Sequence, residues 1–173
     1  MKKTIFIILV SMFLTSYAFA DEIVIQMQLV NEQGFGKNIG TVAATDSKYG
    51  LLLIPQLSDL APGIHGFHVH QNADCSPAMK DGKPVAGLTA GGHLDPAGTG
   101  KHEGPYGKGH LGDLPVLYVG ADGKATLPIL APRLKIADLK GRSLMIHSGG
   151  DNYSDQPEKL GGGGARIACG VIK

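Results

Sequence analysis

The chain of 173 residues lacks a surplus of charge of either sign and lacks an apolar run long enough to span a membrane. It carries 16 Lys and Arg residues against 15 Asp and Glu residues, a formal net charge of +1. Nucleic acids and anionic membranes are bound through a basic excess, so neither is expected as a partner. The longest apolar stretch, residues 5–14, is shorter than the roughly 18 to 20 residues of a membrane-spanning helix.

The N-terminal segment has the order of features typical of a secretory signal peptide. Two lysines precede the apolar stretch, and a small-residue site ending in Ala20 precedes Asp21. We expect cleavage after Ala20, which removes residues 1–20 and leaves one exported, soluble domain of residues 21–173. Because that domain does not begin with Cys, no lipid anchor is indicated.

Cysteine is also scarce, since Cys75 and Cys169 are the only two in the sequence. An exported chain lies in a compartment where disulfides persist, so we expect these two residues to form a disulfide bond. In the chain-entropy model, closing a loop of about 95 residues stabilises a fold by roughly 4 to 5 kcal/mol.

A long helical period is absent, whereas short strand-like segments recur between turn residues. Strands are predicted over residues 23–30, 38–45, 49–54, 64–70, 114–119, 124–131, 143–147 and 165–172. Residues 134–139 are predicted to form a short helical turn. Short strands together with 26 glycines and 10 prolines favour an all-β barrel or sandwich, which hides the edges of its sheets.

Two long segments, residues 71–113 and 151–164, do not fit as strands. The first is rich in Gly and Pro but poor in large apolar residues, so it has no core of its own. Loops of this length are usually functional or disordered. The first loop also contains three histidines, which indicates that a metal ion orders it.

The strand predicted over residues 64–70 contains a pair of histidines in alternate positions. Alternation places His68 and His70 on one face, about 7 Å apart, and the apolar residues on the other. Paired imidazoles on one face suit a metal ion, although such pairs are often incidental. The same alternation groups His65 with the apolar residues, so we interpret His65 as structural.

Four residues of the long loop have the side chains of a zinc site: His93, His102, His110 and Asp113. Three imidazoles and a carboxylate make a closed tetrahedral zinc site, and the free energy of zinc binding would order the loop. The alternative is a solvated glycine-rich loop with scattered histidines.

A second metal is indicated by His147, which follows an apolar run and is a candidate third ligand beside His68 and His70. An all-imidazole site with an open position suits copper. Arg166 lies three residues before Cys169, so the expected disulfide would bring its guanidinium near this site. The alternative for Arg166 is a salt bridge at the surface.

Five motifs together closely resemble copper/zinc superoxide dismutase, in particular its bacterial periplasmic class. They are GFHVH at residues 66–70, GHLDP at 92–96, KHEGP at 101–105, GHLGDL at 109–114 and ARIACGVI at 165–172. The resemblance spans nearly all of the expected mature chain. It implies an eight-stranded Greek-key β-barrel, an immunoglobulin-like sandwich, with two long functional loops.

The resemblance also implies one copper ion and one zinc ion per subunit. It assigns copper to His68, His70, His93 and His147, and zinc to His93, His102, His110 and Asp113. His93 would bridge both metals as an imidazolate and carry a proton during turnover. Arg166 would attract and orient the anionic substrate. Asp151 would accept a hydrogen bond from one histidine at each metal.

The implied reaction is the disproportionation of superoxide to dioxygen and hydrogen peroxide, which would protect the cell envelope from oxidative damage. The implied location is the periplasm, and the bacterial class contains both monomers and homodimers. Animal members carry charged residues in the loop before the arginine, whereas here Leu160 and four glycines precede Ala165. We therefore expect Lys80 and Lys83, near Cys75, to steer superoxide.

Two other classes of function remain open at this point. A periplasmic metal buffer or delivery protein would use the same ligands without turnover, but it would not need Arg166 beside an open copper position. A structural β-domain with a loop ordered by zinc would leave His68, His70 and His147 without a purpose.

Overall fold

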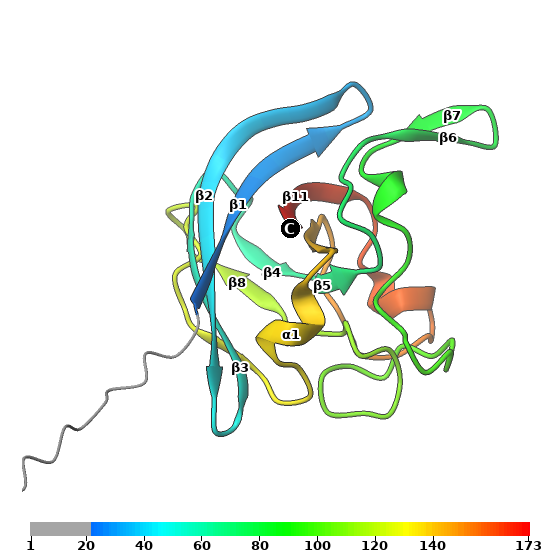
Figure 1. Ribbon diagram of the computed structural model, residues 1–173. Coiled ribbons are helices and arrows are strands. Elements are labelled where there is room, and N and C mark those ends of the chain that lie inside the picture. The colour runs from blue at the N-terminus through cyan, green and yellow to red at the C-terminus, as the bar shows by residue number, and fades with distance from the viewer. Residues whose placement is uncertain (1–21) are drawn as a thin grey trace, which may run out of the picture.

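The computed structural model describes residues 22–173, and the predicted signal peptide lies outside the described residues. The described chain is nearly all β, which confirms the predicted fold class (Figure 1). Its strands are β1 (Glu22–Asn31), β2 (Gly34–Ser47), β3 (Gly50–Leu57), β4 (Gly63–His65), β5 (Phe67–His70), β6 (Ala78–Lys80), β7 (Lys83–Val85), β8 (Leu117–Val119), β9 (Ile129–Ala131), β10 (Arg142–His147) and β11 (Arg166–Ile172).

Helices are few and short within residues 22–173. They are the 3-10 helix η1 (Leu88–Ala90), the α-helix α1 (Ile136–Leu139) and the 3-10 helix η2 (Lys159–Gly162). The first and last of these lie in the two long loops, and α1 falls in the predicted helical turn. None of them has the length and apolar character needed to cross a membrane.

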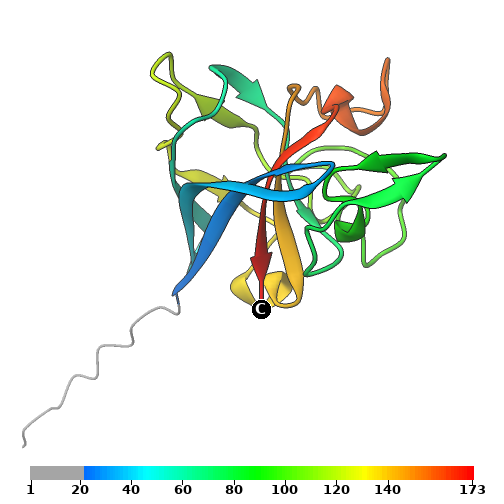
Figure 2. The ribbon, with the colours of Figure 1, turned by 90° about the horizontal axis from the view of Figure 1, so that it is seen from above.

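Seven strands form one antiparallel sheet in the order β5-β10-β11-β1-β2-β3-β9. This order puts the last two strands of the chain, β10 and β11, between β5 and β1. Strands that are far apart in the sequence therefore pair: β10 with β5, and β11 with β1. A second antiparallel pair, β4 and β8, and a hairpin of β6 and β7 complete the structure. The sheet is strongly curled (Figures 1 and 2), as a Greek-key barrel requires.

The main core is an apolar cluster enclosed by the curled sheet and the β4–β8 pair, and a second, smaller cluster surrounds the cysteines. Alternate residues of each strand enter it, for example Leu51 and Leu53 of β3 and Leu144 and Ile146 of β10. β5 contributes Phe67 and Val69, neither of which is exposed to solvent. The residues between and beyond them, His68 and His70, therefore lie on the opposite face of the barrel wall.

The strand predicted over residues 64–70 is divided at Gly66. β4 pairs with β8 and β5 pairs with β10, while the backbone of Gly66 exchanges hydrogen bonds with Gly149 and His147. The alternation within β5 is nevertheless as predicted. His65 is buried, and its two ring nitrogens lie 2.7 Å from the carbonyl oxygen of His147 and 2.8 Å from that of Ala61. His65 thus makes structural contacts, as interpreted from the sequence.

The long loop contains a hairpin that the sequence prediction missed. β6 and β7 are joined by Asp81 and Gly82, which both have positive φ angles of 51° and 76°. An Asp-Gly pair with two positive φ angles is typical of a two-residue hairpin turn, so the signal was present in the sequence. The predicted strands at residues 114–119 and 124–131 are reduced to β8 and β9, the last three residues of each segment.

The predicted disulfide between Cys75 and Cys169 is present, with both residues buried. It attaches the start of the long loop to β11, which lies between β1 and β10 in the sheet. The loop is thus fixed at one end to the barrel by a covalent bond. Figure 1 shows the rest of the loop, in green, on the same side of the molecule as the orange segment that contains η2.

Candidate metal centre

Six histidines and one aspartate are buried together on the outer face of β5 and β10, beneath the two long loops. The residues are His68, His70, His93, His102, His110, Asp113 and His147. β5 and β10 supply three of them and the long loop supplies four. The structure therefore brings together all seven residues that the sequence indicated as metal ligands.

The long loop is held against β5 by backbone hydrogen bonds on both sides of Val69. Leu94 donates to the Val69 carbonyl over 2.8 Å, and Val69 donates to the Gly112 carbonyl over 2.9 Å. A Cβ atom on Gly112 would lie 2.2 Å from the Val69 oxygen, so only glycine permits this approach. The contact places Asp113 beside His68 and His93 beside His70, each pair as partners in an antiparallel backbone bridge.

The first group of possible ligands consists of His68, His70, His93 and His147, whose ligand atoms all lie within 4.8 Å of one another. The Nε2 atoms of His70 and His147 are 3.4 Å apart. Their Nδ1 atoms face the carbonyl oxygens of Gly91, at 3.0 Å, and Gly164, at 3.3 Å. Each ring is thus oriented through one nitrogen, while the other points into the group, as in imidazole ligands of a metal.

The second group is centred on Asp113. Its Oδ1 lies 2.9 Å from His93 Nδ1 and 3.4 Å from His110 Nδ1, and its Oδ2 lies 3.0 Å from His102 Nδ1. Asp113 therefore contacts all three histidines of the zinc set implied by the resemblance. The four residues here whose ligand atoms all lie within 4.8 Å of one another include His68 in place of His110. The His68 ring stacks on His93 with centroids 3.9 Å apart.

Two imidazole nitrogens in the two groups, His68 Nδ1 and His93 Nε2, are buried with neither a hydrogen bond nor an ion pair. His102 Nδ1 and His110 Nδ1 are also buried and face only the Asp113 carboxylate, at 3.0 and 3.4 Å. An unpaired buried polar atom costs free energy, which coordination of a metal ion would offset. With bonds of about 2.0 Å to nitrogen, ligand atoms of one metal lie roughly 3 to 4 Å apart. The donor types, their burial and their spacing all fit bound metal ions.

Asp151 joins the two groups through its carboxylate, which is fully buried. Its Oδ2 accepts a hydrogen bond from His68 Nε2 over 2.8 Å, and its Oδ1 accepts one from His102 Nε2 over 2.7 Å. The four glycines of residues 161–164 begin next to this carboxylate. A Cβ atom on Gly161, where φ is +71°, would lie 2.0 Å from Asp151 Oδ1. A side chain at that position would displace the carboxylate from both imidazoles.

Two further residues of the same loop position the site and were missed by the sequence prediction. Asp155 accepts hydrogen bonds from the backbone of His102, over 2.9 Å, and of Leu160, over 3.1 Å. Tyr153 Oη accepts a hydrogen bond from the backbone of Val116 over 3.0 Å. The Asp155 contact ties the segment around Asp151 to the long loop, and the Tyr153 contact ties it to the residues that precede β8. No sequence spacing identifies Asp155 and Tyr153 in advance, because their contacts depend on how segments distant in the sequence pack together.

Arg166 lies beside the first group, half-buried at the start of β11. Its guanidinium donates hydrogen bonds to the carbonyl oxygens of Gly87, over 2.5 Å, and Gly91, over 2.6 Å. The Gly91 oxygen also faces His70 Nδ1. Two of the five N–H donors of the guanidinium are thereby engaged, and the others remain for an anion.

Burial and neighbouring charges shift the pKa values of these groups in opposite directions. Burial lowers the pKa of His68, His70 and His93, and it lowers that of His147 to about 4. Burial acts in the same sense on His102, but its contacts with Asp113 and Asp151 prevail and raise its pKa to about 9. At neutral pH the imidazoles of His68, His70, His93 and His147 are thus neutral and able to bind a metal ion, whereas His102 must first lose a proton.

A family model described as copper/zinc superoxide dismutase matches residues 38–172. The chain is 61% identical over 150 residues to a protein named superoxide dismutase (Cu-Zn) 2 from Salmonella typhimurium, which covers 86% of this chain and 87% of that protein.

Two solved structures are similar to the whole described barrel. The copper/zinc superoxide dismutase from Brucella abortus has a TM-score of 0.87 and 52% identity, covering 88% of this chain and 100% of that chain. The monomeric copper, zinc superoxide dismutase from Salmonella enterica, solved in solution, has a TM-score of 0.80 and 60% identity, with coverage of 88% and 100%.

The pKa shifts predict that the metal-free protein is most stable near neutral pH. As pH falls through about 6.5, histidines of the unfolded chain bind protons that the buried histidines do not, and His147 alone would lower the free energy of unfolding by about 3 kcal/mol by pH 4. The stabilisation by charged His102 is fully present below about pH 6.5 and is lost as pH rises through about 9. Urea unfolding of the metal-free protein across this range measures both effects.

The variant His147→Gln is the control for the acid side, because glutamine does not titrate. We expect a smaller loss of unfolding free energy between pH 6.5 and pH 4 in this variant than in the wild type. A wild-type stability that is constant between those two values would contradict the prediction.

Proposed function

Since the chain belongs to the copper/zinc superoxide dismutase family, we propose that its two buried histidine groups are a copper site and a zinc site that share His93. The protein is an oxidoreductase that converts superoxide to dioxygen and hydrogen peroxide, with copper and zinc as cofactors. The proposed copper ligands are His68, His70, His93 and His147, and the proposed zinc ligands are His93, His102, His110 and Asp113.

The observation that carries this assignment is the position of His93. His68 and His93 both belong to the two groups, but the Nε2 of His68 is engaged by Asp151. His93 has Nδ1 2.9 Å from Asp113 and Nε2 buried without a hydrogen-bond partner. An imidazole has two nitrogens, so a ring in this position has one to offer each metal. A site that only ordered the loop would not need the second nitrogen.

A bound copper ion supplies one-electron chemistry, by which one superoxide is oxidised to dioxygen and a second, with two protons, is reduced to hydrogen peroxide. The protein's own residues bind the anion and manage the protons. Arg166 would hold superoxide beside the first group with its free N–H donors and its permanent charge. His93 Nε2 would carry one of the protons. Asp151 would keep the His68 and His102 rings in register.

The decisive experiment is to load purified mature protein with copper and zinc and to follow superoxide decay. We expect rapid decay with the wild type and a rate no better than buffer with His147→Ala, because the copper group loses a ligand. Ser143→Ala is the matched control, since Ser143 lies on the same strand and is buried without a hydrogen-bond partner. It should retain wild-type decay. Full activity in His147→Ala would refute the copper assignment.

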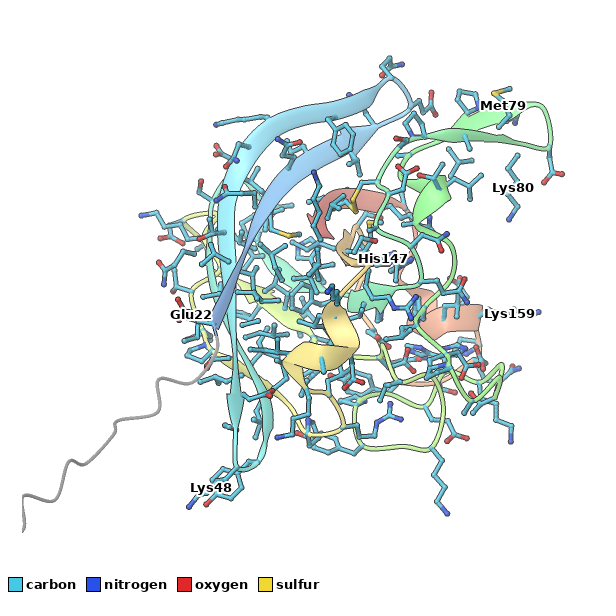
Figure 3. The ribbon with its side chains drawn as sticks, in the orientation of Figure 1. Glu22, Lys48, Met79, Lys80, His147 and Lys159 are labelled. Carbon is cyan, nitrogen blue, oxygen red and sulfur yellow. A yellow bond between two sulfur atoms is a disulfide. The ribbon has the colours of Figure 1, made fainter. Side chains whose placement is uncertain are left out.

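Steering of superoxide is proposed for Lys80 and Lys83, as expected from the sequence. The two residues are exposed and lie directly opposite each other across the β6–β7 hairpin, whose loop continues to η1 and Gly91. Figure 3 shows Lys80 on the same side of the molecule as the two long loops. A pair of adjacent positive charges there would raise the local concentration of the anionic substrate.

The steering proposal predicts that Lys80→Ala with Lys83→Ala lowers the rate of superoxide decay and weakens its dependence on ionic strength. Lys48→Ala with Lys124→Ala is the matched control, because it removes the same charge elsewhere on the barrel. A double variant at 80 and 83 that matched the wild type in both rate and salt dependence would disprove the proposal.

Export and assembly are further proposals. We assign residues 1–20 to a cleaved signal peptide and residues 21–173 to the mature domain. We place that domain in the periplasm, where it would protect the cell envelope.

A homodimer is proposed through the outer face of β4 and β8, where Ile64 and Tyr118 are cross-strand neighbours and are 55% and 53% exposed. The similar Salmonella enterica protein is described as monomeric.

One preparation tests these assignments. Protein recovered from the periplasm should have the mass of residues 21–173, and in sedimentation velocity it should behave as a dimer that Tyr118→Glu dissociates. A retained N-terminal segment would contradict the cleavage site, and a wild-type monomer at all concentrations would contradict the dimer.

A further inference from the structure

Arg133 makes more side-chain hydrogen bonds to the long loop than any ligand does, yet it is not part of either histidine group. It follows β9 and is half-buried at the end of the barrel. Its guanidinium enters the turn between His102 and His110. There it donates to the carbonyl oxygens of Gly104 (3.0 Å), Pro105 (3.0 Å), Gly109 (3.1 Å) and His110 (2.5 Å).

These four acceptors define a ring of carbonyl groups around one cation. Convergent carbonyl dipoles repel one another, and a turn without an apolar core offers them no other partner at its centre. A guanidinium suits this position because it is planar, permanently charged and has N–H donors in several directions. A lysine ammonium would bring the same charge but only three donors on one atom.

The turn that Arg133 fills connects two of the proposed zinc ligands. One of its hydrogen bonds goes to the carbonyl of His110 itself, and the His110 amide donates to Lys101 over 2.9 Å. At the other end of the turn, the Asp155 carboxylate accepts a hydrogen bond from the His102 amide. The backbones of both histidines are thus fixed by contacts that involve no metal, and their Nδ1 atoms face Asp113 within 3.4 Å.

We propose that Arg133 is a positioning residue for zinc: it preorganises residues 102–110 so that His102 and His110 present their imidazoles to the metal together. The inference rests on the proposed zinc site. It goes beyond that site, because the loop is then ordered both by zinc and by a residue that is not a zinc ligand. All four hydrogen bonds of the guanidinium go to this turn, so the effect is confined to the zinc side.

The test compares Arg133→Lys and Arg133→Met with the wild type in four measurements that start from metal-free protein. These are zinc affinity by chelator competition, Cu(I) affinity by chelator competition in the absence of zinc, amide hydrogen exchange over residues 102–112, and the urea midpoint of unfolding. Loss of a group that orients metal ligands typically weakens metal binding by about 10- to 100-fold. We expect a zinc loss in this range, unchanged Cu(I) affinity and faster exchange in the turn.

Arg142→Lys is the matched control, because Arg142 also donates to a carbonyl, that of Gln71, but lies outside the turn. It should leave zinc affinity unchanged. Unchanged zinc affinity in both Arg133 variants would overturn the proposal. So would a parallel fall in zinc affinity, Cu(I) affinity and the unfolding midpoint, since that pattern indicates a general loss of stability.

Asp113→Ala separates this inference from the assignment on which it rests. If Asp113→Ala still binds zinc as the wild type does, the proposed zinc site is wrong. If it loses zinc while Arg133→Lys and Arg133→Met do not weaken binding, the site stands and the positioning role is refuted.

Discussion

The alternation of side chains along β5 is the constraint on which the rest of the structure depends. Phe67 and Val69 enter the apolar core, and His68 and His70 leave the barrel wall on its other side. The packing of the core therefore fixes the direction of two imidazoles without any contribution from the loops. Val69 also anchors the long loop through both of its backbone groups. One four-residue strand thus couples the core, the histidines and the loop that covers them.

Polar contacts take over where the apolar core ends. The two long loops bury the histidines, but their own order comes from carboxylates and a guanidinium placed among backbone and ring donors and acceptors. Asp151 accepts hydrogen bonds from two imidazoles, and Asp155 accepts one from the backbone amide of His102. Arg133 donates to the carbonyl groups of the turn. The disulfide bond of Cys75 fixes the other end of the long loop. Rigid elements carry three possible ligands, and this polar network carries the other four.

Much of this arrangement was predictable from the sequence because it depends on local periodicity and on residue type. Alternation placed His68 and His70 and set His65 apart, and the expectation that the chain is exported predicted the disulfide. The division of the strand at Gly66, the contact of Asp155 with His102 and the position of Arg133 in the turn were not predictable. They arise where segments distant in sequence meet, and neither propensity nor spacing encodes which backbone group a side chain will reach. The β6–β7 hairpin was missed although its Asp-Gly turn was visible.

The carbonyl of Gly91 links the guanidinium of Arg166 to the imidazole of His70, because one oxygen faces both groups. A displacement of this backbone would move the two side chains in the same direction. Thermal motion of the loop would then leave the spacing between the guanidinium and the imidazole nearly constant. The shared acceptor would thus couple the two side chains mechanically, so that the loop can move while their relative position is kept.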